Sequence, residues 1–172
     1  MEVQEINLNN PSEAIISEDK KYRFALWRVW DKHKPLVLFI MLNPSTADGT
    51  FDDPTIRRCV NFAKSWGYGG ILVGNLIAYR ATDPKNLPSS LDLSIININK
   101  EYIRNLHSMA KITVLAYGTN KAARFSDQFL PFTNEDYQSL YIIDKTVNGV
   151  PKHPLYLKGD LKPKFYLHSN KR

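Results

Sequence analysis

Small polar residues follow the apolar runs of this sequence at the points where the runs end. Three runs, at residues 36–42, 71–76 and 112–117, deliver in turn Asn43, Pro44, Ser45, Thr46 and Asp48; Asn75; and Gly118, Thr119 and Asn120. Carboxamides and hydroxyls donate and accept hydrogen bonds, so this set suits the binding of a polar ligand. A fourth run, at residues 140–143, is followed about ten residues later by His153. The same residue types are common in turns, which is the competing interpretation.

The pattern of the runs predicts how these residues are positioned. Residues 36–42 are apolar without alternation, which is typical of a central strand that is buried on both faces. Asp53 and Pro54 predict a helix start, and Gly67 predicts its end. Further helices are predicted near residues 95–106 and 121–129. Strands that alternate with helices predict a parallel sheet with helices on both faces, which binds ligands at the carboxyl ends of its strands.

The two ends of the chain follow other patterns. Residues 22–30 alternate between apolar and polar side chains, which predicts a strand that forms an antiparallel hairpin with the run at 36–42. Residues 1–20 are predicted to be a loose lead-in, and residues 151–172 a basic, proline-containing tail that is mostly loop. The predicted fold over residues 21–172 is a single three-layer α/β/α domain. Its central, mostly parallel four-stranded sheet is extended by the N-terminal antiparallel hairpin strand.

Length and composition limit the class of protein. The 172 residues fit one domain, and the 43% hydrophobic and 23% charged residues are typical of a globular chain. No apolar stretch is long enough to span a membrane, and no signal peptide pattern is visible. The single cysteine, Cys59, cannot form an internal disulfide. We therefore expect a cytoplasmic protein without a membrane partner.

The charge of the chain is distributed unevenly. The net charge is +6, and residues 152–172 contain five lysines and one arginine against the single Asp160. Basic segments of this kind often bind nucleic acid or another polyanion, although they also serve as solvated tails. The oligomeric state does not follow from the sequence.

Standard motifs for cofactors and metals do not explain the polar residues. The chain has no phosphate-binding loop of the common type, and Gly67, Gly69 and Gly70 precede a predicted strand rather than follow one. The four histidines have no metal-ligand spacing. We therefore expect no metal and no cofactor. The carboxylates of Asp48 and Asp52 leave metal-assisted hydrolysis open as a further alternative.

Residues 41–84, which begin MLNPSTADGTFDDPTIRRC and end GNLIAYRATDP, resemble the core signature of a known family. This family is catalogued as domain of unknown function 1643. Residues 22–30 and 153–155 also fit it. The resemblance covers most of the chain, and by itself it implies no activity.

A second, weaker resemblance is to the uracil-DNA glycosylase superfamily, in particular its mismatch-specific branch. Asn43-Pro44 after a strand is similar to the first motif of that branch, and His153-Pro154-Leu155 is similar to its final motif. Met41 and Ser45 stand where that branch has glycines, and the serine of the final motif is missing. The superfamily has a three-layer α/β/α fold, with which the predicted order of elements is compatible.

The second resemblance implies a site for a nucleobase and the cleavage of its bond to a sugar. Asn43 would position the attacking water, and His153 would stabilise the departing base. The base would be read by Asn75, and an aromatic side chain such as Phe51 or Tyr79 would stack on it. Leu155 would wedge into the base stack, and Arg57 or Arg80 would hold a phosphate. We therefore predict a hydrolase that acts on an N-glycosidic bond in DNA or a nucleotide. The alternative is a non-catalytic protein that binds a nucleotide or nucleic acid in the same pocket.

Overall fold

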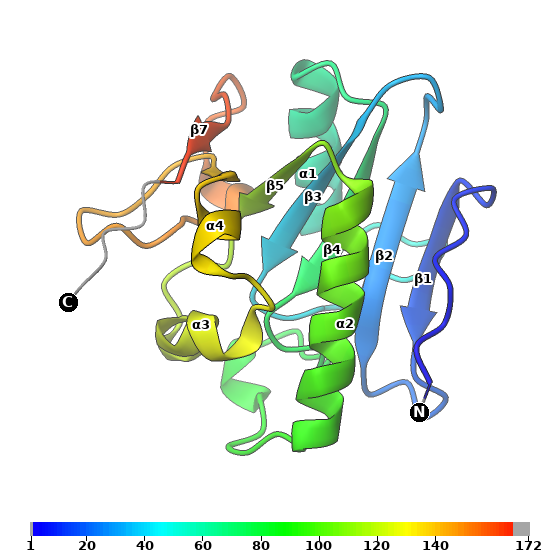
Figure 1. The fold of residues 1–172 in the computed structure, drawn as a ribbon, viewed down its shortest axis with the longest axis vertical. Coiled ribbons are helices and arrows are strands. Elements are labelled where there is room, and N and C mark those ends of the chain that lie inside the picture. The colour runs from blue at the N-terminus through cyan, green and yellow to red at the C-terminus, as the bar shows by residue number, and fades with distance from the viewer. Residues whose placement is uncertain (1, 167–172) are drawn as a thin grey trace.

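The apolar runs form the four central strands of one seven-stranded sheet in the computed structural model, which describes residues 2–166 (Figure 1). In order across the sheet, the strands are β1 (Ser12–Ile16), β2 (Arg23–Val29), β4 (Gly70–Asn75), β3 (Leu36–Met41), β5 (Ile112–Leu115), β6 (Leu140–Ile142) and β7 (Lys164–Phe165). The prediction was a four-stranded central sheet extended by one antiparallel strand, so the mixed α/β class and the mostly parallel sheet are confirmed and the strand count is not.

The four central strands of the sheet are parallel. β3 pairs in parallel with β4 on one side and with β5 on the other, and β5 pairs in parallel with β6. All six residues of β3 are buried, as expected for a strand that is covered on both faces. The carboxyl ends of these strands meet at one edge of the sheet, so the polar residues after β3, β4 and β5 are delivered to the same side of the molecule.

The predicted hairpin between residues 22–30 and 36–42 is wrong. β2 pairs antiparallel with β4 and β1, and β4 separates it from β3. Both edges of β3 are occupied by its parallel neighbours, so β2 can join the sheet only outside them. β1 lies within the predicted loose lead-in. Its half-buried side chains and the register shift between Ile15 and Ile16 give it only a weak sequence signal.

One long helix covers each face of the sheet. Helix α1 (Pro54–Ser65) packs Ile56, Cys59 and Phe62 on the face that carries Val37 and Phe39. Helix α2 (Leu93–Met109) packs on the opposite face, against the alternate residues of β3. Figure 1 shows the two helices on opposite sides of the strands. The arrangement gives two separate hydrophobic cores and three layers.

The first two helices agree with the sequence prediction, and the third does not. Asp53 caps α1 through the backbone N–H of Ile56, and Pro54 occupies the first turn, as predicted. The region predicted as a third helix is divided into a 3₁₀ turn and a single α turn. The short elements are η1 (Pro84–Asn86), η2 (Lys121–Phe125), α3 (Ser126–Phe129), α4 (Asn134–Tyr137) and η3 (Pro154–Tyr156).

The predicted basic tail begins within the described residues and continues beyond them. Residues 154–165 contain η3 and the two-residue strand β7, and the rest of this segment is irregular. Residues 167–172 lie outside the described part of the chain. None of the helices within residues 2–166 has the length and apolar character that a membrane span needs.

Candidate functional site

A cleft of about 430 Å³ lies at the edge of the sheet where the parallel strands end. Four segments form it: the end of β3 with the loop after it, the start of α1, the loop that follows β4, and the segment that leads into η3. Its lining residues are Arg23, Met41, Asn43, Ser45, Thr46, Asp53, Pro54, Thr55, Ile56, Ala81, Thr82, Pro84, His153, Leu155 and Tyr156. Asn43 and His153, the two residues predicted to be catalytic, therefore face the same cleft although 110 positions separate them in the sequence.

The hydrogen bonds of His153 determine what its imidazole can offer. Nδ1 accepts a hydrogen bond from the backbone N–H of Leu155 at 3.3 Å, so the neutral ring carries its proton on Nε2. Burial lowers the pKa of His153 below its usual value of 6.5, and the negative charge of Asp53 opposes this effect in part. The ring is therefore neutral at pH 7, and Nε2–H is a hydrogen-bond donor.

Asn43 is held so that its amide oxygen remains available. Its Nδ2 donates to the backbone carbonyls of Pro44 at 3.0 Å and Ala81 at 2.8 Å. These bonds use both N–H groups of the amide and connect the loops after β3 and β4. Among residues 2–166, no group donates a hydrogen bond to Oδ1. A half-buried acceptor of this kind can orient a water molecule or a ligand N–H group.

Asp53 lines the cleft in addition to capping α1, a role that the sequence analysis did not assign to it. The side chain is 6% exposed. Oδ1 accepts from the backbone N–H of Ile56 at 2.9 Å, and Oδ2 accepts from that of Ala47 at 3.4 Å. The carboxylate thus fixes the loop after β3 to the start of the helix. Because an N-cap explained this residue fully, its sequence gave no separate sign of a site.

Arg23 is the other charged residue of the cleft that sequence reasoning missed. It is 2% exposed, and its guanidinium donates to the carbonyl of Ala47 at 2.9 Å and to Oδ1 of Asn75 at 3.3 Å. Burial lowers the pKa of Arg23 to about 10, and the charge of Asp53 opposes this effect. The available signal was an arginine within a strand that is otherwise largely apolar, because buried charges concentrate at sites.

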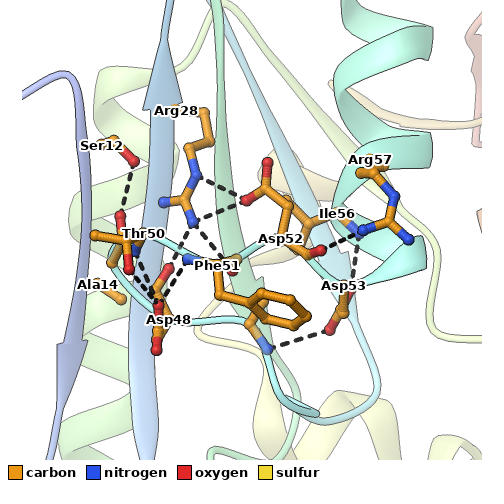
Figure 2. Close-up of polar contacts among 12 residues, drawn as sticks. Ser12, Ala14, Arg28, Asp48, Thr50, Phe51, Asp52, Asp53, Ile56 and Arg57 are labelled. Atoms are coloured by element: carbon orange, nitrogen blue, oxygen red, sulfur yellow. Dashed lines mark hydrogen bonds and ion pairs between the residues drawn. The ribbon is translucent and has the colours of Figure 1, made fainter.

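The loop of residues 48–53 is fixed mainly by Arg28 (Figure 2). Its guanidinium binds Oδ1 of Asp52 at 2.9 Å and donates to the carbonyls of Asp48 and Phe51. The Asp48 carboxylate accepts from the backbone N–H groups of Thr50 and Phe51. Both aspartates considered for metal-assisted hydrolysis therefore have structural partners. Within residues 2–166, no three His, Cys, Asp or Glu side chains form a group that could hold a metal ion.

The other residues predicted to bind substrate are divided between the cleft and its surroundings. Ser45, Thr46 and Leu155 line the cleft, and Pro44 is buried beside it. Gly118 packs against His153, since a β-carbon on Gly118 would stand 3.4 Å from the histidine Cβ.

Several of the predicted residues lie away from the cleft lining. Thr119 and Asn120 line a separate cavity of about 690 Å³. Tyr79 packs edge-on against Tyr22, with ring centroids 5.7 Å apart. The remaining side chains in this group have other surroundings: Asn75 is buried against Arg23, Arg57 and Arg80 donate to the carbonyls of Asp52 and Lys20, and Phe51 is 53% exposed. The substrate contacts predicted for these residues stay predictions.

Comparison with known proteins identifies one family. A search of curated proteins and a search of solved structures each returned no match. The resemblance to uracil-DNA glycosylases stays a hypothesis. A family model described as Protein of unknown function (DUF1643) matches residues 23–155, which is more than half of the chain. The match begins at Arg23 and ends at Leu155, both of which line the cleft. The chain belongs to the DUF1643 family of proteins.

Proposed function

We propose that this protein hydrolyses the N-glycosidic bond between a nucleobase and its sugar, in a nucleotide or nucleic acid, within the cleft at the carboxyl edge of the sheet. The observation that carries the proposal is the complementary state of two side chains in this cleft. His153 offers an N–H donor at Nε2, because Nδ1 is already engaged. Asn43 offers an acceptor at Oδ1, because both of its N–H groups are engaged.

These two groups match the two needs of the reaction. Cleavage leaves the bonding electron pair on the departing base, while the sugar carbon becomes electron-deficient and takes the oxygen of a water molecule. The proton that the water loses ends on the base, so the products are the free base and the hydroxylated sugar. Nε2–H of His153 would stabilise the negative charge that develops on the base. Oδ1 of Asn43 would orient the water, and the Asp53 carboxylate would favour positive charge on the sugar.

The distribution of charge supports a polyanionic substrate. Residues 54–66 and 152–166 contain seven lysines and arginines against the single Asp160, so these two segments carry a charge equal to the whole +6 of the chain. They pack on each other, because Arg58 binds the carbonyl of Leu157 and the Trp66 indole N–H donates to the carbonyl of Leu161 at 2.8 Å. Both segments border the cleft. A basic surface beside a site for the base would hold phosphates.

A non-catalytic binder of nucleotides or nucleic acid is the second candidate. The observation that favours it is the identity of Asn43, because a carboxamide cannot take a proton from water as a carboxylate or an imidazole can. Binding would use the same groups of the cleft. The two candidates therefore predict the same affinity for the ligand, and they differ only in whether a base is released.

The test combines thermal stability with base release. The protein is mixed with nucleobases, nucleosides, nucleotides and short single- and double-stranded oligonucleotides, and free base is followed by chromatography. A ligand that binds the folded state raises the melting temperature. Hydrolysis predicts release of a base, at least 100-fold slower in Asn43→Ala with binding retained, and also slower in His153→Gln. The matched controls are Asn61→Ala, on the exposed surface of α1, and His107→Gln, a half-buried histidine outside the cleft.

Each result of this screen distinguishes the candidates. Stabilisation with base release supports the hydrolase and identifies its substrate. Stabilisation without release, weakened by His153→Gln, supports the binder. If no nucleobase, nucleotide or oligonucleotide changes the melting temperature, base recognition is wrong.

A further inference from the structure

Two buried arginines on strand β2 differ in the partners that their guanidinium groups have. Arg23 is 2% exposed and Arg28 is 8% exposed, and both guanidinium groups bind backbone carbonyls near the loop of residues 47–52. A buried cation is costly unless its N–H groups have acceptors and its charge is balanced. The two residues meet this requirement to different extents.

Arg28 has its partners within the protein. Its Nε donates to Oδ1 of Asp52 at 2.9 Å, and its Nη2 forms an ion pair with the same oxygen at 2.9 Å. Its remaining hydrogen bonds go to backbone carbonyls: those of Glu13, Trp27, Asp48 and Phe51. This arginine is a structural residue with a carboxylate of its own.

Arg23 lacks such partners, although it is the more buried of the two. A guanidinium carries five N–H groups, and that of Arg23 has hydrogen bonds only to Ala47 and Asn75 within residues 2–166. Its Nε is buried without an acceptor among residues 2–166, and so is Nδ2 of the neighbouring Asn75. Arg23 also forms no ion pair with a carboxylate in the described part of the chain.

These two unpartnered groups, Nε of Arg23 and Nδ2 of Asn75, are both hydrogen-bond donors, and the first belongs to a cation that lines the cleft. We propose that Arg23, whose guanidinium is oriented by its hydrogen bond to Asn75, binds a phosphate oxygen of the ligand at the floor of the cleft. The first turn of the twelve-residue helix α1 faces the same space through Thr55, and helix N-termini favour anions. The Asp53 carboxylate, which would oppose an anion, is held by the N–H groups of Ala47 and Ile56.

This inference rests on the proposed function, which identifies the ligand as a nucleotide. It adds that a phosphate group of this nucleotide reaches the floor of the cleft. The phosphate can come from the terminal group of a free nucleotide or from a phosphodiester. Burial lowers the pKa of Arg23 only to about 10, so the guanidinium keeps its charge at pH 7 and can attract either form.

Titration calorimetry with three probes tests the proposal: inorganic phosphate, a nucleoside, and the corresponding nucleoside 5′-monophosphate. The wild-type protein is expected to bind the monophosphate at least tenfold more tightly than the nucleoside, and Arg23→Gln is expected to remove this difference. Arg23→Lys retains the charge and is expected to recover part of it. The control Lys111→Gln removes one positive charge just before β5, at the opposite end of the strands from the cleft. It is expected to leave the affinities unchanged.

The outcomes separate this inference from the proposed function. If a base is released from the nucleoside, but the phosphate adds no affinity and Arg23→Gln behaves like the wild type, the phosphate site is wrong and the proposed function stands. If inorganic phosphate binds to the wild type but not to Arg23→Gln, while no nucleoside or nucleotide releases a base, the phosphate site is supported and the hydrolase is not. A terminal and an internal phosphate are distinguished by comparing the 5′-monophosphate with a dinucleotide. If Arg23→Gln does not fold, Arg23→Lys carries the test, with at least a threefold loss of phosphate affinity expected.

Discussion

Gly118 and His153 are packed so closely that a β-carbon on Gly118 would lie 3.4 Å from the Cβ of His153. The backbone N–H of Gly118 also donates to the carbonyl of Pro151 at 3.0 Å. The end of β5 therefore supports the segment that carries the histidine. Gly118 has a φ of +76°, a conformation that other residues adopt only with strain.

We expect Gly118→Ala to destabilise the protein by about 1 kcal/mol, because alanine is strained in the left-handed region. Gly149 is the matched control, since it has a φ of +81° and, in the described part of the chain, nothing lies within 4 Å of its hypothetical β-carbon. Urea unfolding should give a similar loss for Gly118→Ala and Gly149→Ala. Only Gly118→Ala should also shift the NMR signals of His153. Equal His153 spectra in both variants would show that Gly118 does not support the histidine.

The pH dependence of stability should contain a contribution from His153. Burial lowers its pKa in the folded protein, whereas the unfolded chain has the usual value near 6.5. The unfolded state therefore binds the proton more readily. The contribution of His153 to the free energy of unfolding is fully present above pH 6.5 and is lost as the pH falls towards the pKa of the folded protein. His153→Gln should weaken this loss between pH 7.5 and pH 5.5 in urea unfolding.

A second histidine must be separated from this effect. His107 also has a pKa lowered by burial, and its Nδ1 lies 2.7 Å from Oγ1 of Thr113. Its protonation should also lower the free energy of unfolding as the pH falls. His107→Gln and the double variant allow the two contributions to be separated. An unchanged pH profile in His153→Gln would contradict the prediction for His153.

The Arg28–Asp52 pair should contribute to stability through the loop that it holds (Figure 2). Arg28→Met removes the hydrogen bonds to two carbonyls of this loop, and we expect it to cost about 2 kcal/mol. Asp52→Asn should cost about 0.5 kcal/mol, because the carboxylate is 32% exposed and solvent weakens the pair. A double-mutant cycle by urea unfolding measures their coupling. A coupling of zero would mean that Arg28 acts through the backbone carbonyls alone.

The central part of the fold could be predicted because burial leaves a clear pattern in the sequence. The runs that form β3, β4 and β5 are buried on both faces, and Asp53 with Pro54 is a local signal that needs no tertiary contact. The partner of β2 could not be predicted in this way. Alternation shows that a segment is a strand, but the choice between β3 and β4 as its neighbour depends on which edges the crossovers occupy.

Residues that line the cleft could be predicted where they closely follow a strand or belong to a recognised motif. Asn43 was found for that reason, and His153 through its motif. Arg23 was missed because it lies at the start of β2. This strand was predicted to pair with β3, whereas it pairs with β4. Thr119 and Asn120 follow β5 as expected but line a different cavity, because the left-handed turn at Gly118 changes the direction of the chain.

The thiol of Cys59 should be unreactive in the folded protein. It is fully buried on α1 against the sulfur of Met41, at a distance of 3.9 Å, and burial raises its pKa far above the usual value. A thiolate is needed for attack on a disulfide reagent. Modification by such a reagent at pH 8 should therefore follow the rate or population of global unfolding, and it should accelerate in urea in parallel with the loss of structure. Fast modification without urea would show local opening of α1.

The two roles of Asp53, as helix cap and as a charge in the cleft, should separate in two substitutions. Asparagine preserves an acceptor for the N–H of Ile56, so Asp53→Asn should retain most of the stability, whereas Asp53→Ala should lose about 1–2 kcal/mol. Both substitutions remove the negative charge beside Arg23 and His153. Asp53→Asn should therefore lower the pKa of His153 further, measured by NMR titration, because the charge that opposed the effect of burial is gone. If the pKa of His153 does not move in Asp53→Asn, the carboxylate acts on the helix alone and the electrostatic link across the cleft is absent.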